Sequence, residues 1–157
     1  DIHMMVIDPH RFFYELIDAG ADSITIHYES TPDFDSTLSK LTSLNVESSV
    51  AINPNTSLTT VQSYLAEINQ LLIMSVNPGY GGQKFIPSSI NKIEAAKSLI
   101  DQLNLSTKIQ VDGGINSNTI SNVFTAGADI VVAGSAIYND MKDIETSIKT
   151  LKDSIIL

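Results

Sequence analysis

Short apolar runs that end in small-residue turns recur along the chain, and this repetition constrains the fold more than any other feature. The clearest run spans residues 71–76 and is followed by a glycine-rich turn at residues 79–82. A near-continuous apolar run of strand length is typical of a strand buried on both faces of a parallel sheet. Two further runs end in Gly113-Gly114 and in Gly134-Ser135. Because a helical pattern follows each turn, the sequence predicts repeated strand–turn–helix units.

The apolar periodicity predicts six strands and six helices in alternation. The strands are expected at residues 1–6, 23–28, 48–52, 71–76, 108–111 and 129–133. The helices are expected at residues 12–19, 38–44, 61–68, 90–100, 116–126 and 144–155, with a loop at residues 31–34. This alternation through short loops indicates a parallel sheet with right-handed crossovers. Near-copies at two helix-to-strand junctions, residues 19–22 and 126–129, support a repeated βα unit.

Two architectures fit this pattern: a doubly wound open sheet and a (β/α)8 barrel, the TIM fold. Phosphate-binding glycines after the last strands are typical of the barrel, whereas the open fold usually carries its glycine fingerprint after the first strand. The sequence therefore favours an α/β barrel. Since only six βα units are predicted, residues 1–157 are expected to form a single, incomplete (β/α)8-barrel domain.

Charge and composition exclude several classes of function. The chain carries 9 basic and 18 acidic residues, a net charge of -9, which argues against nucleic acid and anionic membranes as partners. It has no cysteine, which excludes disulfides and thiolate metal sites. No apolar run approaches the roughly 20 residues that span a bilayer. We therefore expect a soluble, cytoplasmic protein.

The glycine turns are candidate anion sites. Glycine lacks a Cβ atom, so backbone N–H groups at such a turn can approach a phosphate closely. Backbone amides bind phosphate without lysine or arginine, so the acidic composition does not argue against a phosphorylated small molecule. The alternative is that glycine serves only the geometry of tight turns. Three such turns, each at the carboxyl end of a strand, favour the phosphate interpretation.

Four segments of the sequence resemble the ribulose-phosphate 3-epimerase family. They are DIHMM at residues 1–5, MSVNPGYGGQKF at 74–85, VDGGI at 111–115 and VAGSAI at 132–137. The resemblance implies an enzyme of the pentose phosphate pathway that interconverts D-ribulose 5-phosphate and D-xylulose 5-phosphate. It also implies that the chain corresponds to the third to eighth βα units of the family's barrel and is N-terminally truncated. The two missing units would supply a serine near the substrate and a His-x-Asp motif.

The resemblance assigns roles to particular residues. His3 and Asp112 match two ligands of a catalytic divalent metal ion, which would be Zn, Fe(II), Mn or Co, and Asp112 also matches an acid/base carboxylate. Met5 and Met74 match methionines that line the reacting sugar. The substrate and phosphate contacts match His3, Gly79, Tyr80, Gly81, Gly82, Asp112, Gly113, Gly114, Gly134 and Ser135. The full-length parent is expected to form a homo-oligomer.

The chemistry of epimerisation explains why this residue set matters. Inverting a carbon beside a ketone requires a base on one face and an acid on the other, and a metal ion stabilises the charge that develops on the oxygens. Because only Asp112 of the expected carboxylate pair is present, the isolated chain is expected to be inactive. A turn-forming Asp112 and a core His3 are the structural alternatives.

Two other functions stay open at this stage. The first is epimerisation of a ketohexose phosphate such as allulose 6-phosphate, and the second is phosphate binding without catalysis. His27 and Glu29 are expected to support the site without binding the metal ion, and His10 is expected at the surface. Met4 and Met141 are expected to serve packing rather than the site, as methionine usually does.

Overall fold

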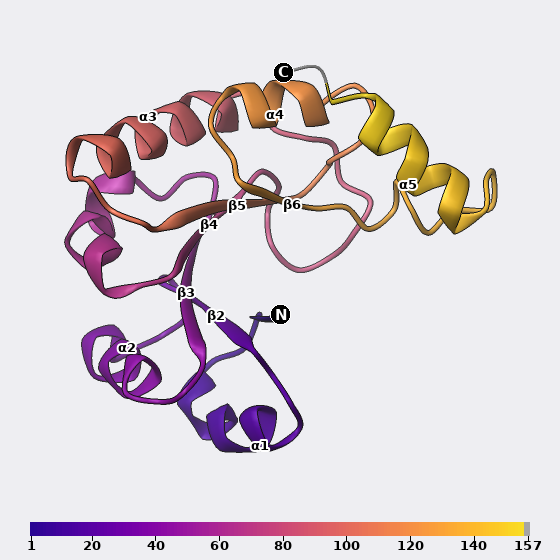
Figure 1. The fold of residues 1–157 in the computed structure, drawn as a ribbon. Helices are drawn as coiled ribbons and strands as arrows, with labels where there is room; N and C mark the ends of the chain where they lie inside the picture. Colours follow the sequence, from indigo (N-terminus) through magenta and orange to yellow (C-terminus); the bar gives the residue numbers. More distant parts are fainter. Residues whose placement is uncertain (156–157) are drawn as a thin grey trace.

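The computed structural model describes residues 1–155 and contains a six-stranded parallel sheet (Figure 1). The strands are β1 (Ile2–Met4), β2 (Ser23–His27), β3 (Glu47–Ile52), β4 (Gln70–Met74), β5 (Lys108–Asp112) and β6 (Ile130–Val132). They lie in sequential order from β1 to β6, and every neighbouring pair is parallel. This order contradicts the doubly wound alternative, whose strand order reverses at a switch point. The chain is a parallel α/β half-barrel.

Helices cover the convex side of the curved sheet (Figure 1). The α-helices are α1 (Phe13–Asp18), α2 (Phe34–Thr42), α3 (Ser89–Gln102), α4 (Ile120–Thr125) and α5 (Ile144–Asp153). Three short 3-10 helices are η1 (Pro9–Arg11), η2 (Leu58–Thr60) and η3 (Gln62–Glu67). Within residues 1–155, no helix combines the length and the apolar character that crossing a membrane requires.

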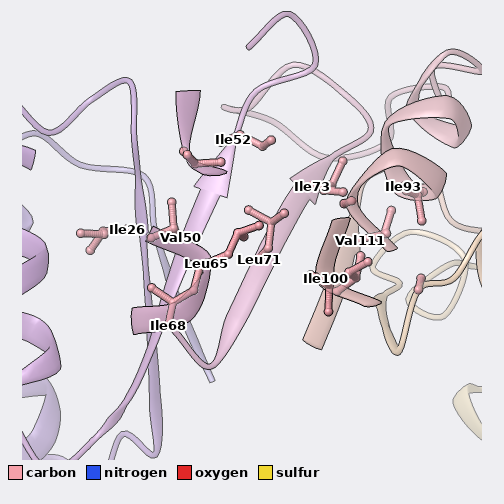
Figure 2. Packing of buried hydrophobic residues seen from close by; sticks show 14 of the residues in the cluster. Ile26, Val50, Ile52, Leu65, Ile68, Leu71, Ile73, Ile93, Ile100 and Val111 are labelled. Carbon is pink, nitrogen blue, oxygen red and sulfur yellow. The ribbon is translucent and has the colours of Figure 1, made fainter. Parts of the chain in front are cut away.

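The main hydrophobic core fills the layer between sheet and helices. Val50, Leu71 and Ile73 point from adjacent strands into this layer, and Ile93 and Ile100 of α3 belong to the same buried cluster on the side of Ile73 (Figure 2). All five side chains are buried. Burying a side chain of this size contributes roughly 1.5–3 kcal/mol. The alternation along each strand therefore fixes which residues face the helices and which face the concave side.

The concave side carries the alternate residues of the same strands. A small apolar cluster of Ala51, Leu72, Met74 and Val76 lies there, apart from the main core. The strand register aligns Met74 with Asp112, and Asp112 with Val132. Because these residues stand at the carboxyl ends of their strands, the register brings them to one level at one edge of the sheet.

Two predicted helices differ from those observed. Residues 61–68 were expected to be a regular helix, but they form η3, a 3-10 helix that ends at Glu67 because Ile68 already has extended backbone. The helix expected from residue 116 begins only at Ile120. Side-chain hydrogen bonds close a turn before it: Asn116 N donates to Thr119 Oγ1 at 2.9 Å, and Asn118 N donates to Asn116 Oδ1 at 2.9 Å.

The remaining differences lie at the ends of elements. Strand β1 is shorter than the expected residues 1–6, and Asp8 adopts a left-handed backbone conformation just beyond it. Helix α2 begins at Phe34, inside the expected loop, and α5 ends at Asp153 rather than at residue 155. Met4 is buried and His10 is exposed, which confirms both predictions. The prediction for Met141 is wrong, because its side chain is 91% exposed. Met141 lies in a turn in which its backbone N–H donates to Asn139 Oδ1.

Candidate active site

A cavity of about 320 Å³ lies at the carboxyl ends of β4, β5 and β6. The three glycine turns and the ends of these strands form its walls. Its lining includes Met5, Met74, Gly79, Tyr80, Gly81, Gly82, Asp112, Gly113, Gly114, Gly134 and Ser135. The structure therefore brings together every residue that the resemblance singled out except His3, which lies beside the cavity in contact with Asp112.

Gly113 and Gly114 are required by the packing of the site. Both have positive φ angles, 121° and 65°. A Cβ atom on Gly113 would lie 2.4 Å from Val76 Cγ2, and one on Gly114 would lie 2.3 Å from the backbone nitrogen of Phe85. Larger residues at these two positions would push the β5 turn away from the glycine loop, so both glycines hold the two walls of the cavity together.

Gly81 and Gly134 differ from this pair. A Cβ atom on either would meet no protein atom within 4 Å, and neither glycine has a positive φ angle. Neither therefore needs to be glycine for reasons of packing or backbone conformation. The space beside them is open, as a site for a small anion requires.

The glycine loop itself is closed by a residue whose role the sequence did not indicate. Gln83 Nε2 donates to the carbonyl oxygen of Asn77 at 2.6 Å and to that of Tyr80 at 2.9 Å. Tyr80 is 73% exposed at the rim of the cavity. These two hydrogen bonds join the end of the loop at residues 77–83 to its beginning and its middle, so the loop is closed.

Asp112 is positioned by the neighbouring strand. Ser75 is fully buried, and its hydroxyl donates to the carbonyl oxygens of Gly113 at 2.6 Å and Asp112 at 3.0 Å. The backbone N–H of Ser75 also donates to the Asp112 carbonyl at 2.8 Å. The two peptide groups that follow the Asp112 Cα atom are therefore held in place by Ser75.

His3 and Asp112 meet across the concave face of the sheet. His3 Nδ1 lies 3.4 Å from Asp112 Oδ2, and the two side chains are 18% and 23% exposed. A second contact supports the same approach, because Gln110 Nε2 donates to Asp1 Oδ2 at 2.8 Å. The curvature of the half-barrel thus brings β1 to the inner side of β5.

His27 and Glu29 extend this contact toward β2. His27 Nε2 lies 2.8 Å from His3 Nε2, with the ring centroids 5.0 Å apart and an interplanar angle of 20°. His27 Nδ1 lies 3.4 Å from Glu29 Oε2. Burial alone would raise the pKa of Glu29, but hydrogen bonds from His27, Asn53 and Thr56 outweigh it and lower the pKa to about 2. Glu29 is therefore a carboxylate held by several donors.

The loop that holds Glu29 is itself anchored by α3. Glu29 Oε1 accepts from the Asn53 backbone N–H at 2.7 Å and from the Thr56 hydroxyl. Lys92 Nζ donates to the carbonyl oxygens of Asn53, Pro54 and Thr56 at 2.9, 2.7 and 2.6 Å. Burial lowers the pKa of Lys92. No sequence pattern indicated Lys92, because its partners are backbone carbonyls of a distant loop.

His3 and Asp112 could supply two of the four ligands that a tetrahedral metal site uses. An imidazole nitrogen and a carboxylate oxygen suit zinc and related transition metals. Two ligands about 2.1 Å from one ion at the tetrahedral angle lie about 3.4 Å apart, which matches the separation of His3 Nδ1 and Asp112 Oδ2. Within residues 1–155, no group of three His, Cys, Asp or Glu side chains is arranged to hold a metal ion. The donors present fit a metal ion but do not complete its coordination.

A parallel half-barrel with its cavity at the carboxyl ends of the strands defines the class as α/β, related to TIM barrels. Solved structures agree. A 3-hexulose-6-phosphate synthase aligns with a TM-score of 0.69 and 25% identity, over 98% of this chain and 72% of that protein. A 3-keto-L-gulonate-6-phosphate decarboxylase from Vibrio cholerae aligns with a TM-score of 0.70 and 18% identity, over 97% and 69%. The latter likeness shows the fold alone.

Sequence comparison then identifies the family. The sequence model of the ribulose-phosphate 3 epimerase family matches residues 1–138. Ribulose-phosphate 3-epimerase of Aquifex aeolicus is 39% identical over 156 residues, which cover 99% of this chain and 70% of that protein. The Bacillus subtilis enzyme is 36% identical over 155 residues, covering 98% and 71%. This chain belongs to the ribulose-phosphate 3-epimerase family, whose members are isomerases.

Proposed function

We propose that the protein interconverts D-ribulose 5-phosphate and D-xylulose 5-phosphate by moving the proton at C3, with a divalent metal ion as cofactor. This chain would supply the third to eighth units of an eight-unit barrel. The observation that carries the proposal is the position of Asp112, which faces a glycine-walled cavity and lies 3.4 Å from His3.

In this proposal, different residues of the chain bind the phosphate, orient the sugar and shield the reacting carbon. Backbone amides of the glycine turns bind the phosphate, because Gly81 and Gly134 leave open space beside them. The phosphate then fixes the sugar with C3 toward Asp112. Met5 and Met74 line the same cavity and exclude water from the reacting carbon. Proton transfer by a general base positioned in this way contributes on the order of 100- to 10,000-fold in rate.

Asp112 removes or returns the C3 proton on one face of the sugar. His3 and Asp112 would hold the metal ion, whose positive charge stabilises negative charge on the substrate oxygens. The acid/base group for the opposite face is not among the side chains that line this cavity. In the proposal it comes from the two units that precede β1 in the family's barrel.

The test uses the gene-length protein, meaning the longest polypeptide that the gene of this chain encodes. We expect it to epimerise D-ribulose 5-phosphate in the presence of a divalent metal ion. Asp112→Asn and His3→Ala should each lower turnover by at least about 100-fold. His10→Ala changes an exposed histidine outside the site and serves as the matched control, with activity unchanged.

Three outcomes would contradict the proposal. Full turnover by Asp112→Asn would show that another group moves the proton. Turnover of D-allulose 6-phosphate in preference to the pentose phosphate would identify a hexose-phosphate epimerase built on the same site. Binding of sugar phosphate without any turnover would indicate a phosphate-binding barrel.

A further inference from the structure

Four side chains form a continuous contact chain that ends at Asp112. Glu29 Oε2 lies 3.4 Å from His27 Nδ1, and His27 Nε2 lies 2.8 Å from His3 Nε2. His3 Nδ1 then lies 3.4 Å from Asp112 Oδ2. These residues come from β1, β5 and the end of β2, so the chain crosses the concave face of the half-barrel. Both ring nitrogens of each histidine have a partner, so these partners determine which ring nitrogen carries the hydrogen.

Glu29 fixes the first ring hydrogen, because a carboxylate accepts hydrogen bonds and cannot donate them. Its second oxygen already accepts from the Asn53 N–H and the Thr56 hydroxyl. His27 Nδ1 must therefore carry the hydrogen that faces Glu29. With the opposite tautomer, a nitrogen lone pair would face a carboxylate oxygen at 3.4 Å with no proton between them. His27 is 4% exposed, so water does not relieve that repulsion.

The proton on His27 Nδ1 decides the tautomer of His3. A neutral imidazole with hydrogen on Nδ1 has a bare acceptor at Nε2. The 2.8 Å contact between the two Nε2 atoms requires one hydrogen, so His3 Nε2 is the donor. A neutral His3 with hydrogen on Nε2 has its lone pair on Nδ1, the atom that faces Asp112.

We propose that Glu29 and His27 are positioning residues that fix the His3 tautomer, so that Nδ1 presents a lone pair toward Asp112. This inference rests on the proposed function, in which His3 and Asp112 hold the metal ion. His27 Nδ1 and Glu29 Oε2 have hydrogen-bond geometry, whereas His3 Nδ1 and Asp112 Oδ2 face each other at 3.4 Å without it. The ring hydrogen therefore lies at the Glu29 end, and a cation between His3 and Asp112 would relieve the repulsion at the other end. A hydrogen-bond partner on the far nitrogen is the usual device that orients a metal-binding imidazole, and here that partner is a second histidine backed by a carboxylate.

The support for this device reaches as far as α3. Lys92 holds three carbonyls of the loop whose Asn53 N–H and Thr56 hydroxyl bind Glu29. The His3 and His27 rings are nearly coplanar, with an interplanar angle of 20°, and their Nε2 contact restricts rotation of both rings. Glu29 thus has a fixed position from which it selects one tautomer in His27 and, through it, in His3.

The test reads the ring protons directly by nitrogen-15 NMR of histidine side chains in the metal-free, gene-length protein. Two-bond nitrogen–hydrogen correlations distinguish protonated from bare ring nitrogens. We expect His3 with hydrogen on Nε2 and His27 with hydrogen on Nδ1. Glu29→Gln should give a mixture of tautomers in both rings, because an amide can donate as well as accept. His27→Phe keeps an aromatic ring beside His3 but removes the acceptor, so it should also release the His3 tautomer.

Metal affinity provides the second readout, measured by titration with Zn²⁺ alone. Glu29→Gln should weaken Zn²⁺ binding by about 10- to 100-fold, the usual effect of losing a supporting partner of a metal ligand. Glu15→Gln makes the same change at an exposed glutamate on α1 and should leave Zn²⁺ binding unchanged. Circular dichroism checks that each variant is folded, and His27→Phe carries the test if Glu29→Gln does not fold.

Hydrogen on His3 Nδ1 in the unsubstituted protein would overturn the inference. So would a Glu29→Gln variant that keeps both the His3 tautomer and the Zn²⁺ affinity. If Asp112→Asn still abolishes epimerisation in that case, only the positioning role fails. If Asp112→Asn epimerises normally, the proposed function itself fails, whatever the tautomers are.

Discussion

His3 Nδ1 lies 3.4 Å from Asp112 Oδ2, although their strands, β1 and β5, stand four positions apart in the sheet. A flat sheet would separate neighbouring strands by about 4.8 Å each, which places such residues far beyond contact. Their contact therefore measures how strongly the sheet curls. It also means that the site depends on β1 keeping its place at the edge of the sheet.

The glycine turns give the first prediction. Gly134→Val adds a side chain beside the cavity without a backbone clash or a positive φ angle. We expect the folded variant to bind inorganic phosphate at least tenfold more weakly, which corresponds to about 1.4 kcal/mol. Isothermal titration of the gene-length protein with phosphate measures this.

Two comparison variants make that result specific. Ala95→Val enlarges an exposed residue of α3 and should leave phosphate binding unchanged. Gly114→Val should instead destabilise the fold, because its Cβ would meet the Phe85 backbone at 2.3 Å. Equal phosphate affinity of Gly134→Val and the unsubstituted protein would place the anion site elsewhere.

Glu29 gives a prediction about pH. Its pKa is lowered from 4.5 to about 2, so the folded state favours the ionised form more than the unfolded state does. The stabilisation is complete above about pH 4.5 and is lost as the pH falls toward 2. We expect Glu29→Gln to cost more unfolding free energy at pH 6 than at pH 3. The difference should be about 1 kcal/mol once solvent screening of this partly exposed group is allowed for.

Urea unfolding of the gene-length protein at the two pH values measures the effect. Thr56→Val removes one donor to Glu29 and should give a smaller change of the same sign. A loss of stability that is equal at pH 6 and pH 3 would show that the hydrogen bonds to Glu29 do not favour its ionised form.

Much of the fold could be predicted from the sequence because each βα unit carries its own local signal. The apolar run at residues 71–76 and the glycines after it define β4 and its turn without reference to the rest of the chain. The start of α4 could not be predicted in this way. It depends on the hydrogen bond from Asn116 N to the Thr119 hydroxyl, and the same residue types also occur inside loops.

Site residues could be predicted where they belong to a sequence motif. They could not be predicted where their role depends on hydrogen bonds to backbone far away in the sequence. Asp112 and the glycine turns belong to recognisable segments, and the structure places them around one cavity. Ser75 and Lys92 were missed because both donate to backbone carbonyls, which any residue type provides. Met141 was misjudged because the apolar character of a residue does not reveal that its turn points into solvent.

The open edges of the sheet give the third prediction. Strands β1 and β6 each have a hydrogen-bonded neighbour on one side only within residues 1–155. Unpaired edges invite pairing with other chains. We expect the isolated 157-residue polypeptide to associate as its concentration rises, as sedimentation velocity would show.

A charge on the edge should reduce that association. Val132→Lys places a lysine on β6, and lysine on edge strands opposes edge-to-edge pairing. Leu103→Lys removes a similarly exposed apolar side chain after α3, away from both edges, and should have little effect. A monomeric polypeptide with a cooperative melt at ordinary temperatures would contradict the edge argument.

The last prediction concerns catalysis by the isolated 157-residue polypeptide and follows from its functional groups. Asp112 faces the cavity, but no second carboxylate lines it, so one face of the substrate lacks a proton donor. The metal ion would have His3 and Asp112 as its only described ligands, and it should bind weakly. A missing acid/base group lowers the rate by on the order of 100- to 10,000-fold. We therefore expect negligible epimerisation and, under saturating Zn²⁺, slow exchange of the C3 proton of ribulose 5-phosphate with deuterium. Proton NMR would follow this exchange.

Asp112→Asn should abolish that exchange, whereas His10→Ala should preserve it. Turnover by the polypeptide at the rate of the gene-length protein would show that Asp112 needs no opposing group, and the two-sided mechanism would then be wrong.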